Sequence, residues 1–154
     1  MATLDNAEAD MSRADLAARL AGIPGSTKAE ERDESLWISA PQLDVAAMAR
    51  DMKALGYRLI TMTGQAGEGD ETAIIYHYAR REQYVSFKTS TRGGAIASVT
   101  PMLRMASWIE REIHDFFAVD FIGHPNLIPL LRPPGMKEGF FREAELHSTS
   151  PEKQ

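Results

Sequence analysis

The sequence predicts an α+β fold in which an antiparallel or mixed sheet is covered on one face by helices and followed by an extended, proline-rich C-terminal segment. Two observations predict this class. Short β-prone runs are interleaved with two longer segments whose apolar residues recur at helical spacing. Four prolines, at positions 125, 129, 133 and 134, exclude a long regular element after residue 121. We therefore expect a flexible tail with a short helix over residues 1–34, the α+β domain over 35–132 and an extended tail over 133–154.

The composition is that of one globular domain and excludes several classes of function. The chain has 154 residues, 44% of them hydrophobic and 25% charged, which is enough to bury a core. Its formal net charge of -5 argues against nucleic-acid partners, because phosphate binding needs a concentrated basic face. Cysteine is absent, so disulfides, thiolate zinc sites and iron–sulfur clusters bound by this chain are excluded.

Nothing in the sequence directs the chain into or across a membrane. No apolar run approaches the roughly 20 residues of a membrane-spanning helix. The first ten residues are acidic, where a targeting signal would be basic. We expect the protein to remain in a prokaryotic cytoplasm.

The N-terminal region carries the signals of one short helix. Ser12 and Asp15 form a capping box, and Gly22 ends the helical spacing of the apolar residues Leu16, Ala17 and Leu20. Two interpretations are open: a helix on the surface of a tail, or a docking segment for a partner.

The predicted domain begins with a strand and a helix. Leu36 to Ile38 is a β-prone run, and Pro41 is placed where a helix can begin without an amide donor. We expect a helix from Pro41 to about Leu55, ended by a left-handed Gly56.

An antiparallel meander is expected next, with strands over residues 57–63, 71–78 and 84–89. The glycine-rich stretch GQAGEGD, residues 64–70, lies between the first two strands. It matches neither nucleotide-binding glycine pattern, and its acids would repel phosphate, so we interpret it as a turn.

A second helix is predicted from about Pro101 to Phe117, after a short apolar run over residues 95–99. At about 100° per residue, one arc of this helix gathers apolar residues that we expect to face the sheet, namely Met105, Trp108, Ile109, Ile113, Phe116 and Phe117.

Three acids of this helix are predicted to have different surroundings. The pairs Glu110–His114 and Arg111–Asp115 fall on the opposite, exposed side, where such pairs contribute about 0.3–0.5 kcal/mol each. Glu112 falls inside the apolar arc and needs a partner there, either an arginine or a row of backbone amides in the following loop. A structural anchor, a contact to a partner subunit and a catalytic acid are the three interpretations of Glu112.

The same segment resembles a known family. ASWIEREIHDFF, residues 106–117, followed by DFIGHPNL, residues 120–127, is similar to the signature of the thirty-kilodalton subunit of respiratory complex I, the NADH:quinone oxidoreductase, and of its relatives in energy-converting membrane-bound hydrogenases. The Glu-Arg-Glu triplet, the acid three positions later and the Gly-His-Pro run make the resemblance specific. A weaker resemblance extends back to Leu36.

The resemblance implies a non-catalytic α+β subunit with no redox centre of its own. Its implied partners are a large catalytic subunit, beside a quinone or nickel–iron site, and other peripheral-arm subunits. These partners would hold the iron–sulfur, flavin or nickel–iron cofactors, on the cytoplasmic side of the prokaryotic inner membrane. Carried over by position, seven residues are assigned to positioning and interface contacts, and none to catalysis, cofactor or metal binding: Glu110, Arg111, Glu112, Asp115, Gly123, His124 and Pro125.

Three departures from the family pattern stand out. Ala118 occupies a usual glycine position and costs about 1 kcal/mol if the site needs a positive φ. Ile128 stands where a basic residue is usual. The ending, residues 132–154, lacks the run Gly-His-Pro-Leu-Arg-Lys-Asp that is common in complex I, and the Pro129-Leu130-Leu131 run is closer to the energy-converting hydrogenases.

Two other classes of function remain as alternatives. A metal-dependent enzyme would draw on His77, His114, His124 and His147, but these histidines lack any metal-binding spacing. A stand-alone binding module predicts a monomer that forms no stable assembly.

Overall fold

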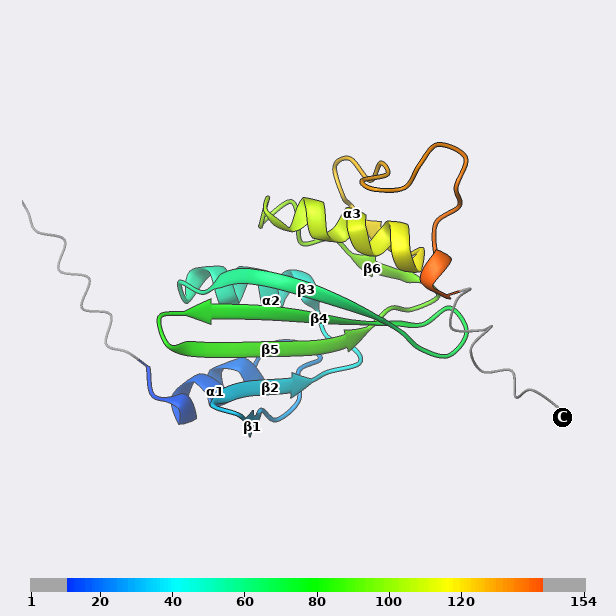
Figure 1. Cartoon of the computed structure of the whole chain (residues 1–154). Coiled ribbons are helices and arrows are strands. Elements are labelled where there is room, and N and C mark those ends of the chain that lie inside the picture. Colours follow the sequence, from blue (N-terminus) through cyan, green and yellow to red (C-terminus); the bar gives the residue numbers. More distant parts are fainter. Residues whose placement is uncertain (1–10, 143–154) are drawn as a thin grey trace, which may run out of the picture.

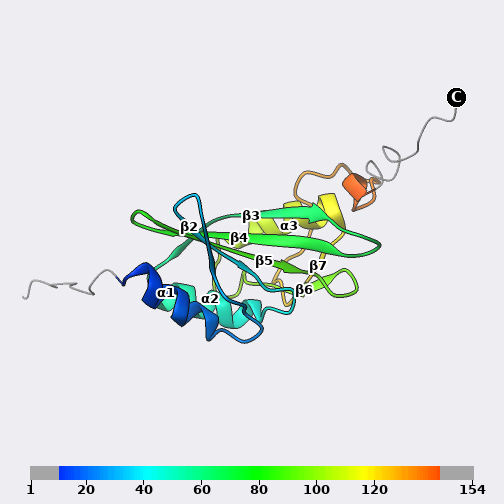
Figure 2. The same cartoon turned by 90° about the horizontal axis from the view of Figure 1, so that it is seen from below.

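The computed structural model describes residues 11–142, which form a mixed sheet with two helices on one side and a third along one edge (Figure 1 and Figure 2). The helices are α1 (Arg13–Ala21), α2 (Val45–Ala54) and α3 (Ala106–Phe117). The main sheet contains β1 (Glu30–Arg32), β2 (Ser35–Ser39), β3 (Arg58–Ala66), β4 (Thr72–Arg80) and β5 (Gln83–Ser90). A small second sheet contains β6 (Ala95–Ala97) and β7 (Asp120–Ile122).

The strand order of the main sheet is β1-β2-β5-β4-β3. Strands β3, β4 and β5 form the predicted antiparallel meander, whereas β2 pairs with β5 in parallel and β1 pairs with β2 antiparallel. The predicted fold class is therefore confirmed. Strand β7 is absent from the prediction, because its three residues are extended through parallel pairing with β6, a partner that is distant in sequence.

One face of the sheet forms the core with the helices. Every second residue of β4 and β5 points to this face, and Tyr76, Tyr78 and Phe87 are its largest fully buried side chains. Helices α1 and α2 pack behind the sheet in Figure 1, and α3 lies along its β3 edge. Gly64 of β3 lets α3 approach, because a Cβ there would lie 2.8 Å from Cδ2 of Phe117.

The interpretation of residues 1–34 as a tail is wrong for the part that the structure describes. The capping box is present, since the Ser12 side chain accepts the amide of Asp15, and Gly22 caps the other end of α1. However, Leu16, Leu20 and Ile23 are at most 2% exposed and belong to the main core. Full burial of such side chains contributes about 1.5–3 kcal/mol each, so α1 is part of the domain. Residues 1–10 and 143–154 lie outside the described residues.

Helices α2 and α3 begin later than predicted. Helix α2 begins at Val45, not at Pro41, because the Asp44 side chain accepts the amide of Ala47 at 2.9 Å and caps it. Helix α3 begins at Ala106, because residues 99–104 form separate turns. The ends agree with the prediction: Gly56, with φ of 76°, follows α2, and α3 ends at Phe117.

The β3–β4 connection is shorter than predicted. Strand β3 continues through Gln65 and Ala66, which pair with Ala73 and Thr72. The turn is confined to residues 67–71, where the amide of Gly67 donates to the carbonyl of Glu71. The glycine-rich stretch is therefore the end of a hairpin, as its composition predicts.

None of the helices between residues 11 and 142 is both long and apolar enough to cross a membrane.

Ala118 caps the C-terminus of α3 in the left-handed conformation, with φ of 54° and ψ of 30°. Its amide donates to the carbonyl of His114, which satisfies one of the last helical acceptors. A glycine would adopt this conformation without the contact between Cβ and the residue's own backbone.

Replacing Ala118 with glycine should raise the free energy of unfolding by about 1 kcal/mol, because the positive φ no longer strains a Cβ. For a domain of this size, the melting temperature should rise by about 2–8 °C in a thermal unfolding experiment. The matched control is Ala49→Gly inside α2, where the residue is fully buried and helical and the same substitution should lower stability. A lower melting temperature for Ala118→Gly would contradict the strain argument.

Candidate functional site

The predicted site residues lie on α3 and on the residues that follow it. Helix α3 has the sheet and residues 98–100 on one side and residues 125–142, which we call the strap, on the other. Figure 1 shows the strap leaving α3, arching away from the sheet and returning to the end of β3. The site is therefore one helix held between two non-helical segments.

The side of α3 that faces the sheet differs from the predicted arc. The buried stripe contains Ala106, Glu110 and Ile113, with Phe117 partly buried against Gly64. Met105 and Trp108 are 53% and 68% exposed, so their predicted packing against the sheet is wrong. The stripe includes a carboxylate, which an assignment based on apolar spacing places outside.

Glu110, predicted to be exposed, is the buried acid of this stripe, with no accessible surface. Its Oε1 accepts the amide of Val99 at 2.7 Å, and its Oε2 accepts the hydroxyls of Ser98 at 2.5 Å and Thr100 at 2.7 Å. Glu112, predicted to be the buried acid, is only half-buried and makes no hydrogen bond within residues 11–142. Three donors on one carboxylate offset the cost of removing its charge from water.

The Gly-His-Pro loop packs against the first half of α3. The side chain of His124 is fully buried, with Nε2 at 3.1 Å from the Ser107 hydroxyl and 3.9 Å from Oε2 of Glu110. Its Nδ1 accepts the amide of Asn126 at 2.9 Å, which leaves the ring proton on Nε2. Gly123 has φ of 84°, and the ring of Pro125 is exposed at the start of the strap. His124 therefore anchors the loop.

Two tyrosines of β4 lie within the electrostatic reach of Glu110. Burial raises the pKa of Tyr76 well above its usual value, and the Glu110 charge and Tyr78 add to this effect. Burial, with the Glu110 charge second, also raises the pKa of Tyr78. Both hydroxyls are buried and stay protonated, and neither meets a hydrogen-bond partner among the described residues. The sequence offers no signal for these contacts, because they depend on how α3 lies over β4.

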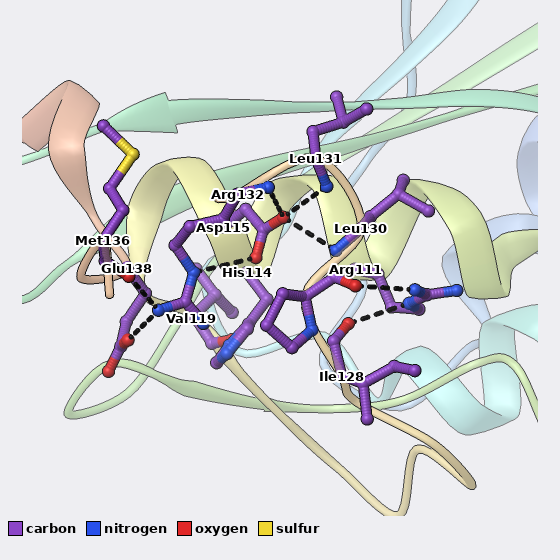
Figure 3. A network of polar contacts seen from close by, with 11 residues as sticks. Arg111, His114, Asp115, Val119, Ile128, Leu130, Leu131, Arg132, Met136 and Glu138 are labelled. Carbon is purple, nitrogen blue, oxygen red and sulfur yellow. Dashed lines mark hydrogen bonds and ion pairs between the residues drawn. The ribbon is translucent and has the colours of Figure 1, made fainter. Parts of the chain in front are cut away.

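Asp115 holds the strap on the outer side of α3 (Figure 3). Its Oδ2 accepts three successive amides, from Leu130 and Leu131 at 2.9 Å and from Arg132 at 3.2 Å. Its Oδ1 accepts Nε of Arg132 at 3.3 Å. The partners predicted for Glu112, a row of amides and an arginine in the following loop, are thus found at Asp115.

These contacts set the charge of Asp115. Burial by itself would raise the pKa of this carboxyl, but the hydrogen bonds from the amides of Leu131, Leu130 and Arg132 and from the Arg132 guanidinium outweigh it, so the pKa is lowered. Asp115 is therefore an ionised, fully buried anchor.

The predicted pairs Glu110–His114 and Arg111–Asp115 do not form. Arg111 instead donates from Nε to the carbonyl of Ile128 at 2.9 Å and from Nη2 to that of Pro129 at 2.8 Å. The Nδ1 atom of His114 lies 2.8 Å from the carbonyl of Val119. Figure 3 shows that Arg111 and Asp115 contact neighbouring parts of the strap, so both residues position the segment that follows the helix.

Two arginines absent from the prediction complete the strap. Arg132 also donates to the carbonyl of Met136 at 2.6 Å and to Glu138 at 2.9 Å. Arg142 donates to the carbonyls of Phe117 at 2.6 Å, Gly69 at 2.6 Å and Asp70 at 2.8 Å, and to the hydroxyl of Thr72. It thus joins the end of α3 to the β3–β4 turn. Spacing does not identify Arg142, since three of its four acceptors are backbone carbonyls distant in sequence.

Exposed apolar side chains remain on the outer side of this assembly, which we call the outer face of α3. It contains Met105 and Trp108 of the helix and, from the strap, Ile128 and Leu131, which are 50% and 62% exposed. Met105 also borders a shallow cleft of about 270 Å³ with Arg58, Leu59 and Ile60 of β3. Large exposed side chains clustered in this way mark interaction surfaces.

The histidines considered for a metal site lie apart. His77 is on β4, His114 and His124 have the separate partners given above, and His147 lies outside the described residues. Within residues 11–142, no group of three or more histidine, aspartate or glutamate side chains is placed to hold a metal ion.

Comparison with known proteins identifies relatives of the whole motif region. The family model for the respiratory-chain NADH dehydrogenase, 30 Kd subunit, matches residues 37–147. An NADH-quinone oxidoreductase subunit of Caulobacter vibrioides is 30% identical over 130 residues, which cover 79% of this chain and 64% of that protein. A longer NADH-quinone oxidoreductase subunit of Pseudomonas fluorescens is 31% identical over 91 residues, which cover 56% of this chain and 15% of that protein. The matches thus span less than two thirds of the length of these relatives.

Two solved structures share the fold. One protein of the membrane-bound sulfane sulfur reductase, an archaeal respiratory membrane complex, superposes with a TM-score of 0.69 and 15% identity, covering 92% of this chain and 95% of that protein. The trypsin-resistant fragment of Nqo5 superposes with a TM-score of 0.56 and 21% identity, covering 68% of this chain and 91% of that fragment.

Truncating Glu110 should be far more destabilising than truncating Glu112. Glu110→Ala leaves the amide of Val99 and two hydroxyls buried without an acceptor, so a loss of about 3–5 kcal/mol is expected. Glu112→Ala should change stability by less than about 0.5 kcal/mol. Urea unfolding of both variants measures the difference, and equal losses would mean that Glu110 is not the anchor.

Asp115→Asn should destabilise the protein in a pH-dependent way. The lowered pKa means that the Asp115 contribution is fully present above the unfolded-state pKa of about 3.9 and is lost as the pH falls through the folded-state value. The free energy of unfolding of the variant should therefore be lower than wild type by about 1–3 kcal/mol at pH 7. This difference should shrink below about pH 4. Urea unfolding from pH 7 down to pH 2.5 or so tests it, and a constant difference would contradict it.

Proposed function

The chain belongs to the family of the respiratory-chain NADH dehydrogenase 30 Kd subunit, and from this membership we propose that it is a structural subunit that docks on the large catalytic subunit of a membrane-associated oxidoreductase. In this proposal the protein itself catalyses no reaction. Its motif residues give shape to a contact surface, and electron transfer belongs to its neighbours.

The observation that supports docking best is the outer face of α3. Trp108 is 68% exposed on a helix whose other sides are packed, and Leu131 is 62% exposed beside the Asp115 anchor. Tryptophan and other large apolar side chains are enriched at the centres of protein interfaces, where they lose contact with water. An isolated domain gains nothing from exposing them, whereas a docked subunit buries them against its partner.

The geometry of the strap supports the same proposal. Asp115 and Arg111 bind only backbone groups of residues 128–132, apart from the Arg132 guanidinium on Asp115, so the side chains of Ile128 and Leu131 are left to point outward. Because the Asp115 carboxylate already holds three amides of the strap, the strap has fewer conformations to lose when it binds a partner. The surface is therefore preorganised for a partner.

The remaining assignments follow from the same premise. We place the iron–sulfur, flavin or nickel–iron cofactors in the partner subunits, since this chain has no cysteine to hold a cluster. The assembly would lie on the cytoplasmic side of a prokaryotic inner membrane, which this chain reaches only through its partners, and no nucleic acid takes part. The relatives support both a quinone reductase and another respiratory membrane complex as the assembly.

Trp108→Ala should lower assembly of the complex while leaving the stability of the isolated protein almost unchanged. Because the indole is exposed, the free energy of unfolding of the isolated protein should fall by less than about 1 kcal/mol, against about 3–5 kcal/mol for a core tryptophan. The yield of the assembled complex, measured by native electrophoresis of solubilised membranes, should fall several-fold.

Glu68→Ala in the β3–β4 turn is the control, because Glu68 is exposed and does not belong to the outer face of α3, and it should leave assembly unchanged. Normal assembly of the Trp108 variant would contradict docking through the outer face of α3. A protein that migrates only as a monomer from its native membranes would favour a stand-alone binding module instead.

A further inference from the structure

The sheet has a second face, which carries no helix. The three helices between residues 11 and 142 pack on the core face or along the β3 edge, and Figure 1 views the sheet from the other side, with α1 and α2 behind it. We call this side the open face. By the strand register, it is formed by alternate residues of β2, β5, β4 and β3, including Trp37, Tyr84, Lys88, Ile75, His77 and Arg58.

The centre of the open face is aromatic and carries little charge. The Trp37 and His77 rings meet edge to face with centroids 5.9 Å apart, and Nδ1 of His77 lies 2.9 Å from the Ser86 hydroxyl. Partial burial lowers the pKa of His77, so the imidazole is neutral at neutral pH. Tyr84, in the next register position, is 54% exposed. An exposed tyrosine beside a half-buried tryptophan and a half-buried, neutral histidine has the composition of an interface core.

The charges on this face have the opposite sign to the whole protein. Lys88 and Arg58 are exposed, and neither has an acidic partner in the described part of the chain. Arg32, by contrast, pairs with Glu30 at 2.6 Å. The face thus presents two uncompensated positive charges on a chain of formal net charge -5. A surface with carboxylates opposite Lys88 and Arg58 would complement it.

A second copy of this chain fits the face poorly. Two copies meeting face to face would bring like charges together. Four strands about 4.8 Å apart and about eight residues long cover roughly 500 Å², less than the ~800 Å² per partner of a stable interface. The face therefore suits a contact that adds to another interface, within an assembly that is already held together.

We propose that the open face is a second docking surface, for a neighbouring protein subunit that presents a flat surface with carboxylates opposite Lys88 and Arg58. The proposal rests on the proposed function, because the outer face of α3 supplies the first contact. The protein is then held between two subunit surfaces and bridges them.

Because the chain has no cysteine, single thiols report each surface separately. Ser39→Cys and Thr63→Cys place a thiol at exposed positions on the open face, and Leu131→Cys places one on the outer face of α3, outside the cleft that Met105 shares with Arg58. Glu68→Cys, in the β3–β4 turn, is the control. The rate of modification of this protein by N-ethylmaleimide is measured by mass spectrometry, in the isolated protein and in the complex purified from native membranes with mild detergent.

Both open-face thiols should react at least about ten-fold more slowly in the complex, whereas the Glu68→Cys thiol should react at the same rate in both samples. Adding Lys88→Glu, next to Ser39 in register, should restore fast reaction of the Ser39→Cys thiol by placing like charges in contact.

The outcomes separate the two proposals. Fast reaction of both open-face thiols in the complex overturns the second docking surface, whatever the rate of the Leu131→Cys thiol. If both open-face thiols react slowly in the complex and the Leu131→Cys thiol reacts fast, docking through the outer face of α3 is overturned and the second docking surface stands. Protection that depends on the concentration of the isolated protein would mean a second copy, and protection in membranes that is lost in the purified complex would mean a lipid surface. Either result overturns the proposal of a protein neighbour, as does the absence of any complex that includes this protein.

Discussion

Two buried carboxylates on α3 hold the backbone on both sides of that helix. Glu110 accepts donors from residues 98–100, just before the helix, and Asp115 accepts the amides of residues 130–132, well after it. A buried charge without such partners would cost several kcal/mol. The position of each segment is therefore coupled to the burial of one acid, Glu110 for the segment before the helix and Asp115 for the one after it. The main structural role of these two motif residues is to hold irregular backbone in place.

The anchoring of backbone rather than side chains shapes the surface. With the amides and carbonyls of the strap bound by Asp115 and Arg111, Ile128 and Leu131 stay exposed beside the helix that carries Trp108. The open face, which adjoins the outer face of α3 at the cleft lined by Arg58 and Met105, carries aromatic side chains and uncompensated cations. Such a protein is suited to mediate contacts between larger neighbours, since it presents two preformed surfaces.

Sequence reasoning worked where the signal was local. The capping box at Ser12, the left-handed Gly56 and the meander each depend on residues a few positions apart, and all three are present. It failed where a distant partner decided the outcome. Glu112 was the better candidate for burial by apolar spacing alone, yet Glu110 is the buried acid, because Ser98, Val99 and Thr100 supply its donors. Leu16 and Leu20 stand in a polar stretch with few large apolar residues, which predicts a tail. In the structure both side chains are nevertheless part of the core.

The sequence by itself determined the α+β class, the family motif and the absence of thiol ligands, since these follow from composition, periodicity and local residue patterns. Only the tertiary structure decided the rotation of α3, the anchors of the strap and the exposure of Trp108. The physical reason is that helical periodicity depends only on where the apolar side chains fall along the helix. The free energy of burying a carboxylate depends instead on hydrogen-bond donors that folding brings from elsewhere in the sequence.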